Sequence, residues 1–73
     1  MARLEIESEV TGNVWKLEVQ AGTRVDAGDV LMILESKKME IPVEAPEAGT
    51  VSELRVAEED AVEEDQVIAI LET

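Results

Sequence analysis

The sequence contains an internal repeat with an offset of 37 residues. Residues 3–36 align with residues 40–73 without a gap, and only Lys37, Lys38 and Met39 are left between the two copies. The matched positions keep one glycine and most of the apolar residues: Gly12/Gly49, Val14/Val51, Leu17/Leu54, Val19/Val56, Val25/Val62, Val30/Val67, Ile33/Ile70 and Leu34/Leu71. This repeat predicts two similar halves related by a pseudo-twofold axis. The linking residues would lie at one end of the molecule and the two termini together at the other.

The apolar pattern predicts strands throughout. Residues 3–7 alternate polar and apolar, and residues 30–34 and 67–71 are continuous apolar runs of five. Alternation indicates a half-buried strand, and a short apolar run between turn signals suits a buried one. No segment has a convincing helical period. Seventy-three residues make one small domain, spanning 1–73, with a core of Val, Ile and Leu. We therefore expect an all-β fold that is closed or nearly closed.

Both copies interrupt their strand alternation at the same place. Residues 14–19 alternate except at Val14, and residues 51–56 break at the matching position. A shared break predicts a β-bulge that bends both strands. The three residues 11–13 precede the first of these strands and predict a turn. Trp15 has Ser52 as its repeat mate, so the core does not require tryptophan. We expect Trp15 to be a partly buried strand residue, with a partner contact as the alternative.

Glycines predict two tight turns in the first half. Gly22 and Gly28 flank Val25, and such glycines usually adopt positive φ. Val25 between them would fill the core. The repeat mates of the glycines are Glu59 and Asp65. Because glutamate tolerates positive φ poorly, we expect the first turn of the second half to differ.

The composition excludes several kinds of function. Eighteen acidic and six basic residues give a net charge of −12, which argues against binding to nucleic acid or to an anionic membrane. Absence of Cys and His excludes disulfides, thiol chemistry, zinc sites and His-based triads. The acidic clusters 58–60 and 63–65 lack the spacing of a calcium loop and predict a solvated face. Without an apolar N-terminal segment, the expected location is the cytoplasm.

Residues 35–43 read Glu-Ser-Lys-Lys-Met-Glu-Ile-Pro-Val. This stretch resembles the attachment hairpin of the biotinyl/lipoyl attachment domain family, whose biotin branch typically reads Glu-Ala/Ser-Met-Lys-Met. The central lysine of that motif falls on Lys38, with 35 residues to the C-terminus, as is typical of the family. The resemblance covers essentially the whole chain. It implies a flattened β-barrel, or barrel-sandwich hybrid (hammerhead), with the attachment lysine on a hairpin tip.

The resemblance also implies a function. Biotin would be joined covalently to Lys38, with Glu35, Ser36, Lys37 and Met39 as the other motif residues. A biotin protein ligase would attach it, and the protein would shuttle carboxybiotin between a biotin carboxylase and a carboxyltransferase. The chain would be a free-standing carrier, monomeric in isolation, with no catalytic site or metal of its own. The physical requirement is a lysine on a protruding turn that a ligase can enclose.

One motif position departs from the family. Lys37 stands where biotinyl domains usually have Met and lipoyl domains usually have Asp, so the kind of modification is open on this residue alone. Met39 favours biotin, because lipoyl domains tend to have a small or β-branched residue there. Two alternatives stay open. The chain could be a lipoyl carrier of a 2-oxo acid dehydrogenase-type complex, or an unmodified docking module of the same fold.

Overall fold

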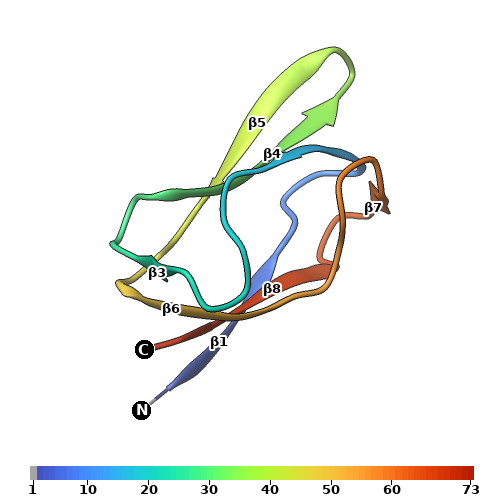
Figure 1. Ribbon diagram of the computed structural model, residues 1–73. Helices are drawn as coiled ribbons and strands as arrows, with labels where there is room; N and C mark the ends of the chain where they lie inside the picture. Colours follow the sequence, from blue (N-terminus) through green and yellow to red (C-terminus); the bar gives the residue numbers. More distant parts are fainter. Residues whose placement is uncertain (1) are drawn as a thin grey trace.

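The computed structural model describes residues 2–73 as eight strands in two antiparallel four-stranded sheets (Figure 1). The strands are β1 (Arg3–Glu7), β2 (Gly12–Leu17), β3 (Arg24–Val25), β4 (Val30–Ser36), β5 (Met39–Glu44), β6 (Gly49–Leu54), β7 (Ala61–Val62) and β8 (Val67–Glu72). One sheet has the order β1-β8-β6-β3 and the other β5-β4-β2-β7. The all-β prediction is confirmed. Within residues 2–73, no helix is long and apolar enough to cross a membrane.

The two sheets have the same construction at an offset of 37 residues. In one sheet Val14 of β2 lies opposite Leu34 of β4, and in the other Val51 of β6 lies opposite Leu71 of β8. The strand orders correspond in the same way, because β1 to β4 map onto β5 to β8. Each sheet therefore contains strands from both halves of the chain, and neither half forms a sheet by itself.

The predicted bulge is present in both halves. The register of β2 against β4 shifts between Val14 and Lys16, which makes Trp15 the extra residue. Ser52 takes the same place in β6. The bulge turns Val14 into the core and leaves Trp15 with 49% of its surface exposed. Trp15 is thus more accessible than an ordinary partly buried strand residue.

The core lies between the two sheets and consists of aliphatic side chains. Its buried members are Ile6, Val14, Val25, Leu31, Met32, Leu34, Ala45, Val51, Val56, Val62, Ile68, Ala69 and Leu71. The apolar runs of β4 and β8 supply the largest of them, as expected for central strands. Val25 and Val62 are both buried, which confirms that the residue between the paired turns fills the core.

Four turn residues adopt positive φ at equivalent positions. Gly22 and Gly28 have φ of 95° and 90°, which confirms the prediction for the first half. Glu59 and Asp65 have φ of 74° and 69°. The expectation that Glu59 would force a different turn was therefore wrong, since the second half keeps the backbone of the first.

Cross-molecule hydrogen bonds explain why the turn survives without glycine. The backbone N–H of Gly22 donates to the carbonyl of Val51 at 2.6 Å, and that of Glu59 donates to the carbonyl of Val14 at 2.7 Å. Each bond joins a turn to the bulged strand of the opposite half. A turn of a different shape would leave these strand carbonyls without their N–H partner. The hydrogen bond across the molecule therefore offsets the strain of positive φ at Glu59.

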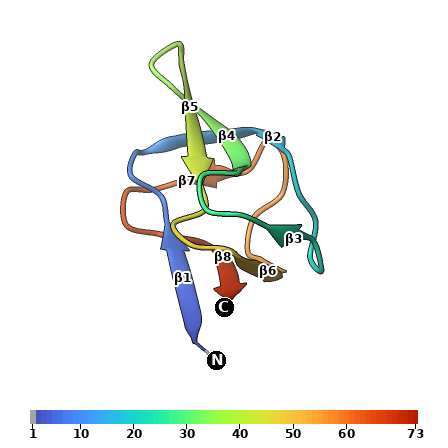
Figure 2. The same ribbon diagram turned by 90° about the vertical axis from the view of Figure 1, so that its left-hand side faces the viewer.

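The two ends of the described chain lie side by side, at the end of the molecule opposite the β4–β5 hairpin (Figures 1 and 2). The N–H of Ala2 donates to the carbonyl of Thr73 at 3.1 Å, and the N–H of Thr73 donates to the carbonyl of Ala2 at 2.9 Å. This arrangement confirms the placement predicted from the repeat.

Candidate attachment hairpin

The motif residues form the end of the β4–β5 hairpin. Ser36, the last residue of β4, pairs with Met39, the first residue of β5, and Lys37 and Lys38 form the two-residue loop between them. Glu35 lies one position before Ser36 on β4. The structure thus brings together all five residues that the motif singled out.

The loop has a defined backbone conformation. Lys37 has φ of 51° and Lys38 has φ of 66°. Positive φ at both central residues is the signature of a type I′ turn, whose twist matches that of the flanking strands. Lysine is not favoured in this conformation, so the pairing of Ser36 with Met39 must hold it. A two-residue loop also fixes the hairpin register, which sets the positions of both lysine Cα atoms.

The loop projects beyond the two sheets, as Figure 2 shows. Lys37, Lys38 and Met39 are all exposed, and Met39 keeps 63% of its surface accessible. None of the ion pairs among residues 2–73 involves a hairpin lysine; they are Arg3–Glu53, Lys16–Glu18 and Arg55–Glu53. An enclosing enzyme therefore does not have to break an ion pair to reach either amine.

The two lysines differ in what lies next to them. Lys37 and Met39 line a hollow of about 390 Å³ together with Glu9 and Glu64, between the hairpin and the β1–β2 connection. Lys38 is not among the residues that line this hollow. Lys37 thus borders this acidic hollow, whereas Lys38 does not.

The root of the hairpin is tied to the start of β2. The hydroxyl of Ser36 donates to the carbonyl of Thr11 at 2.9 Å. Gly12 lies against the carbonyl oxygen of Glu35 so closely that a Cβ on Gly12 would collide with it. These two contacts hold the hairpin at a fixed angle to the sheet. Ser36 therefore helps to position the loop, and its place in the motif does not require a direct chemical role.

The sequence did not reveal the role of Gly12. Residues 11–13 were expected to form a turn, but Gly12 and Asn13 are the first residues of β2 and only Thr11 lies in a bend. Gly12 is needed for space, since its backbone does not adopt positive φ. The sequence did contain one sign of this role, which is that Gly12 is matched by Gly49 in the repeat. A Cβ on Gly49 would collide in the same way with the carbonyl of Glu72.

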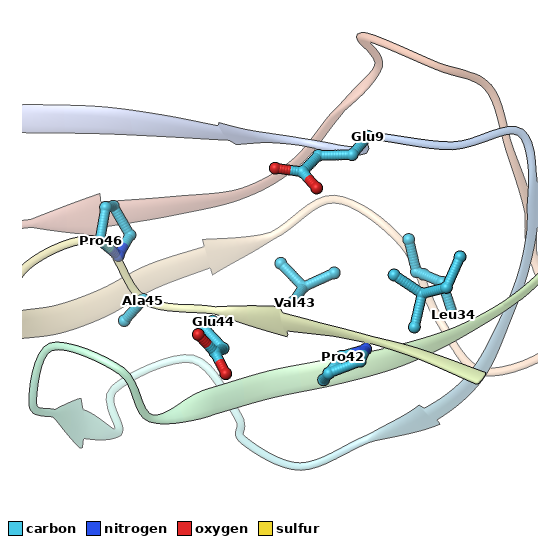
Figure 3. A pocket seen from close by; sticks show the side chains of 8 residues that line it. Glu9, Leu34, Pro42, Val43, Glu44, Ala45 and Pro46 are labelled. Carbon is cyan, nitrogen blue, oxygen red and sulfur yellow. The ribbon is translucent and has the colours of Figure 1, made fainter.

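A separate pocket of about 280 Å³ lies beside β5 (Figure 3). Its lining combines apolar side chains with two glutamates and consists of Glu9, Leu34, Ile41, Pro42, Val43, Glu44, Ala45 and Pro46. This lining contains no Lys, Ser, His or Cys, so the pocket offers no amine, hydroxyl, imidazole or thiol nucleophile. The chemistry available at this end of the molecule is therefore that of the exposed lysine amines.

A primary amine on a rigid, projecting turn is suited to acylation by another protein. The strands place the amine, and the turn leaves space for an enclosing active site. Covalent attachment needs no binding pocket on the carrier, because the amide bond itself holds the group. The fold and the hairpin together define a carrier protein that displays an attached group.

Comparison with known proteins identifies the family. Residues 2–71 match the Biotin_lipoyl family, described as "Biotin-requiring enzyme". The chain is 40% identical over 65 residues to the "Biotin/lipoyl attachment protein" of Bacillus subtilis (strain 168), covering 89% of each chain. It is 39% identical over 67 residues to the "Biotinylated protein TB7.3 homolog" of Mycobacterium leprae (strain TN), covering 92% of this chain and 94% of that one.

The fold is also found within a larger enzyme. The crystal structure of the Kluyveromyces lactis urea carboxylase superposes with a TM-score of 0.90 and 32% sequence identity over 97% of this chain, which corresponds to 6% of that one. The protein belongs to the biotin/lipoyl attachment domain family. Like the free-standing attachment proteins it matches, it is a carrier and not itself an enzyme.

Proposed function

We propose that this protein is a biotin carrier that is acylated on Lys38 and moves a carboxyl group between a biotin carboxylase and a carboxyltransferase. The single observation that carries the choice of residue is the hairpin geometry. Lys38 is exposed in the two-residue turn and, unlike Lys37, does not line the hollow against the body. The motif register, with Glu35 before and Met39 after, points to the same lysine.

Several similarities favour biotin over lipoate. The Mycobacterium leprae relative is named as a biotinylated protein. The chain is also 36% identical over 67 residues to a pyruvate carboxylase of Bacillus subtilis and resembles the urea carboxylase in structure, although it matches only 6% of either chain. Met39 at the tip agrees with the biotin branch of the family. These points support carboxylase partners.

The chain contributes one chemical step. Once deprotonated, the Nζ of Lys38 attacks the carbonyl carbon of an activated acyl phosphate, and the C–N bond of the amide forms as the acyl–oxygen bond breaks. The nucleotide leaves with the electron pair of that bond, and the amine proton passes to a base or to water. When bound, biotin supplies a ureido nitrogen that accepts and releases a carboxyl group. Because the attached group would stay bound to Lys38, its concentration at a docked partner would be high, which makes each delivery effectively intramolecular.

Intact mass spectrometry tests this proposal. The full chain is expressed with a biotin protein ligase and, separately, with a lipoyl-attaching enzyme, and the masses are compared with the unmodified chain. We expect complete addition of one biotinyl group and little or no lipoyl group. Addition of lipoyl alone would identify the protein as a lipoyl carrier. An unmodified mass in both cultures would favour a docking module.

A further inference from the structure

Trp15 is an exposed aromatic side chain on the sheet that carries the attachment hairpin. It lies on β2, which is hydrogen-bonded to β4. Trp15, Asn13, Glu35 and Glu59 line an open hollow of about 460 Å³. Among residues 2–73, Trp15 and Met39 are the exposed large apolar side chains. Tryptophan is the residue type most enriched among dominant contacts in protein interfaces.

The repeat provides an internal control for this position. Trp15 and Ser52 are the extra residues of equivalent bulges, in equivalent registers. Because the bulge of β6 forms with serine, the fold does not require an aromatic side chain there. Burial does not require it either, since half of the Trp15 surface stays exposed. The tryptophan therefore needs an explanation other than folding.

The position of Trp15 relative to Lys38 suggests a reason for the exposed tryptophan. Trp15 follows Val14, which lies opposite Leu34, and Lys38 is four residues beyond Leu34 along the hairpin. The chain reverses between Lys37 and Lys38, and β5 lies two strands from β2, so at ~3.3 Å per strand residue and ~4.8 Å between strands Trp15 and Lys38 are about 15 Å apart. A standard interface buries ~800 Å² on each partner, so a circular face centred on the hairpin tip extends about 16 Å. An enzyme that encloses Lys38 at this scale therefore reaches Trp15 near the edge of the face it covers.

Charge indicates the chemistry of the partner. Glu35 and Glu59 line the hollow with Trp15, and the nearest lysine in sequence, Lys16, is paired with Glu18 at 3.5 Å. The surface thus presents an aromatic ring beside carboxylates that form no ion pair within residues 2–73, on a chain with a net charge of −12. Such a surface complements an apolar pocket rimmed by Lys or Arg.

We propose that Trp15, with Glu35 and Glu59, is a contact surface for the ligase that acylates Lys38, and that the ligase presents an apolar pocket with a basic rim there. The ligase is favoured over the carboxylase because its active site must reach the lysine amine itself, at the tip of the hairpin. A carboxylase reaches only the far end of the attached arm. This inference rests on the proposed function.

Steady-state kinetics with the full unmodified chain test the contact. Biotin protein ligase from the organism that makes this chain is supplied with ATP and biotin, and initial rates are measured against carrier concentration. Trp15→Ser, which copies the second repeat, is expected to raise KM for the carrier roughly tenfold or more, with kcat at saturation within about twofold of wild type. Trp15→Phe should retain most of the affinity.

A matched control comes from moving the aromatic residue to its repeat mate. The double variant Trp15→Ser/Ser52→Trp has the same composition as wild type but should keep the high KM. Each of these proteins has a single tryptophan, so labelling with 5-fluorotryptophan gives one ¹⁹F resonance. Adding ligase without ATP should shift or broaden the wild-type resonance and leave that of the double variant unchanged.

Four results would overturn the inference. The first is an unchanged KM for Trp15→Ser. The second is a ¹⁹F resonance that responds to carrier concentration alone, which would mean that a second copy covers Trp15. The third concerns the salt dependence of KM. A wild-type KM that does not rise with salt, or a KM of Glu59→Gln that rises with salt as steeply as that of wild type, would exclude the basic rim. The fourth is a wild-type chain that the ligase leaves unmodified by intact mass, which would reject the proposed function itself.

Discussion

The two ends of the molecule have the same backbone architecture and different contents. At one end Ser36 pairs with Met39, and at the other their repeat mates Thr73 and Ala2 pair in the same manner. A glycine lies against a strand carbonyl at both ends. Only at the first end does the chain cross between the paired strands through two lysines. The fold thus supplies two equivalent platforms, and the attachment site is created by what joins the strands.

The turns of the two halves have the same backbone conformation but different residues. Gly22 and Gly28 adopt positive φ without strain, whereas Glu59 and Asp65 adopt it with a Cβ. Both sets of turns are held by equivalent hydrogen bonds to the opposite half. One backbone is therefore compatible with two different sequences, and the difference is expected to appear in stability.

The largest expected effect concerns the hairpin end. Lys38→Arg keeps the charge but replaces the nucleophilic amine with a guanidinium that stays protonated, so acylation should fall to zero. Lys37→Arg should be acylated at least in part. Peptide mapping after incubation with ligase measures both. Label on Lys37 alone, or full labelling of Lys38→Arg, would contradict the assignment.

Gly12→Ala and Gly49→Ala distinguish the two ends. Each adds a methyl group where a strand carbonyl already lies, and we expect each to lower the free energy of unfolding by ~2 kcal/mol, or about 10 °C in Tm. Well below Tm, Gly12→Ala should also slow acylation, because it displaces the root of the hairpin. Gly49→Ala should not. Urea melts and ligase assays on both variants give the comparison, and equal acylation rates would show that Gly12 does not position the loop.

Substitutions in the turns should have opposite signs in the two halves. Gly28→Val should destabilise by ~1 kcal/mol or more, because a β-branched residue is strained at positive φ even where space is open. Glu59→Gly should stabilise by about 0.5 kcal/mol, since relief of strain exceeds the added chain entropy. Thermal or urea melts measure both, with Asp65→Gly as the milder control. An unchanged midpoint for Gly28→Val would mean that its turn tolerates a side chain.

The smallest expected effect on stability is at Lys37. Its side chain is exposed and forms no ion pair with the described residues, so Lys37→Met should leave Tm nearly unchanged. Ligase or carboxylase pockets suited to an uncharged thioether must desolvate the lysine head or let it turn outward. Lys37→Met should therefore be biotinylated or carboxylated faster. Equal rates would show that Lys37 is neutral for its partners.

The repeat predicted much of the fold from the sequence alone. It indicated a bulge in each of the strands β2 and β6, the buried Val25 and Val62, and the adjacent ends of the chain. These features follow from the spacing of the apolar residues and from the match between the two repeats, both of which can be seen in the sequence. The motif likewise selected Lys38 before any geometry was known, because the spacing of residue types around a modified lysine is itself sequential.

Other features depended on contacts between residues far apart in the chain. Gly12 reads as a turn glycine until the carbonyl of Glu35 is placed against it. Glu59 has a poor intrinsic preference for its turn, and only a hydrogen bond to Val14 across the molecule explains its conformation. The sequence by itself therefore determined that the chain is all-β and that two lysines stand at the joint between the repeats. Only the tertiary structure decided that Gly12 has no room for a side chain and that Glu59 keeps a strained backbone. Both depend on neighbours that come from distant parts of the chain.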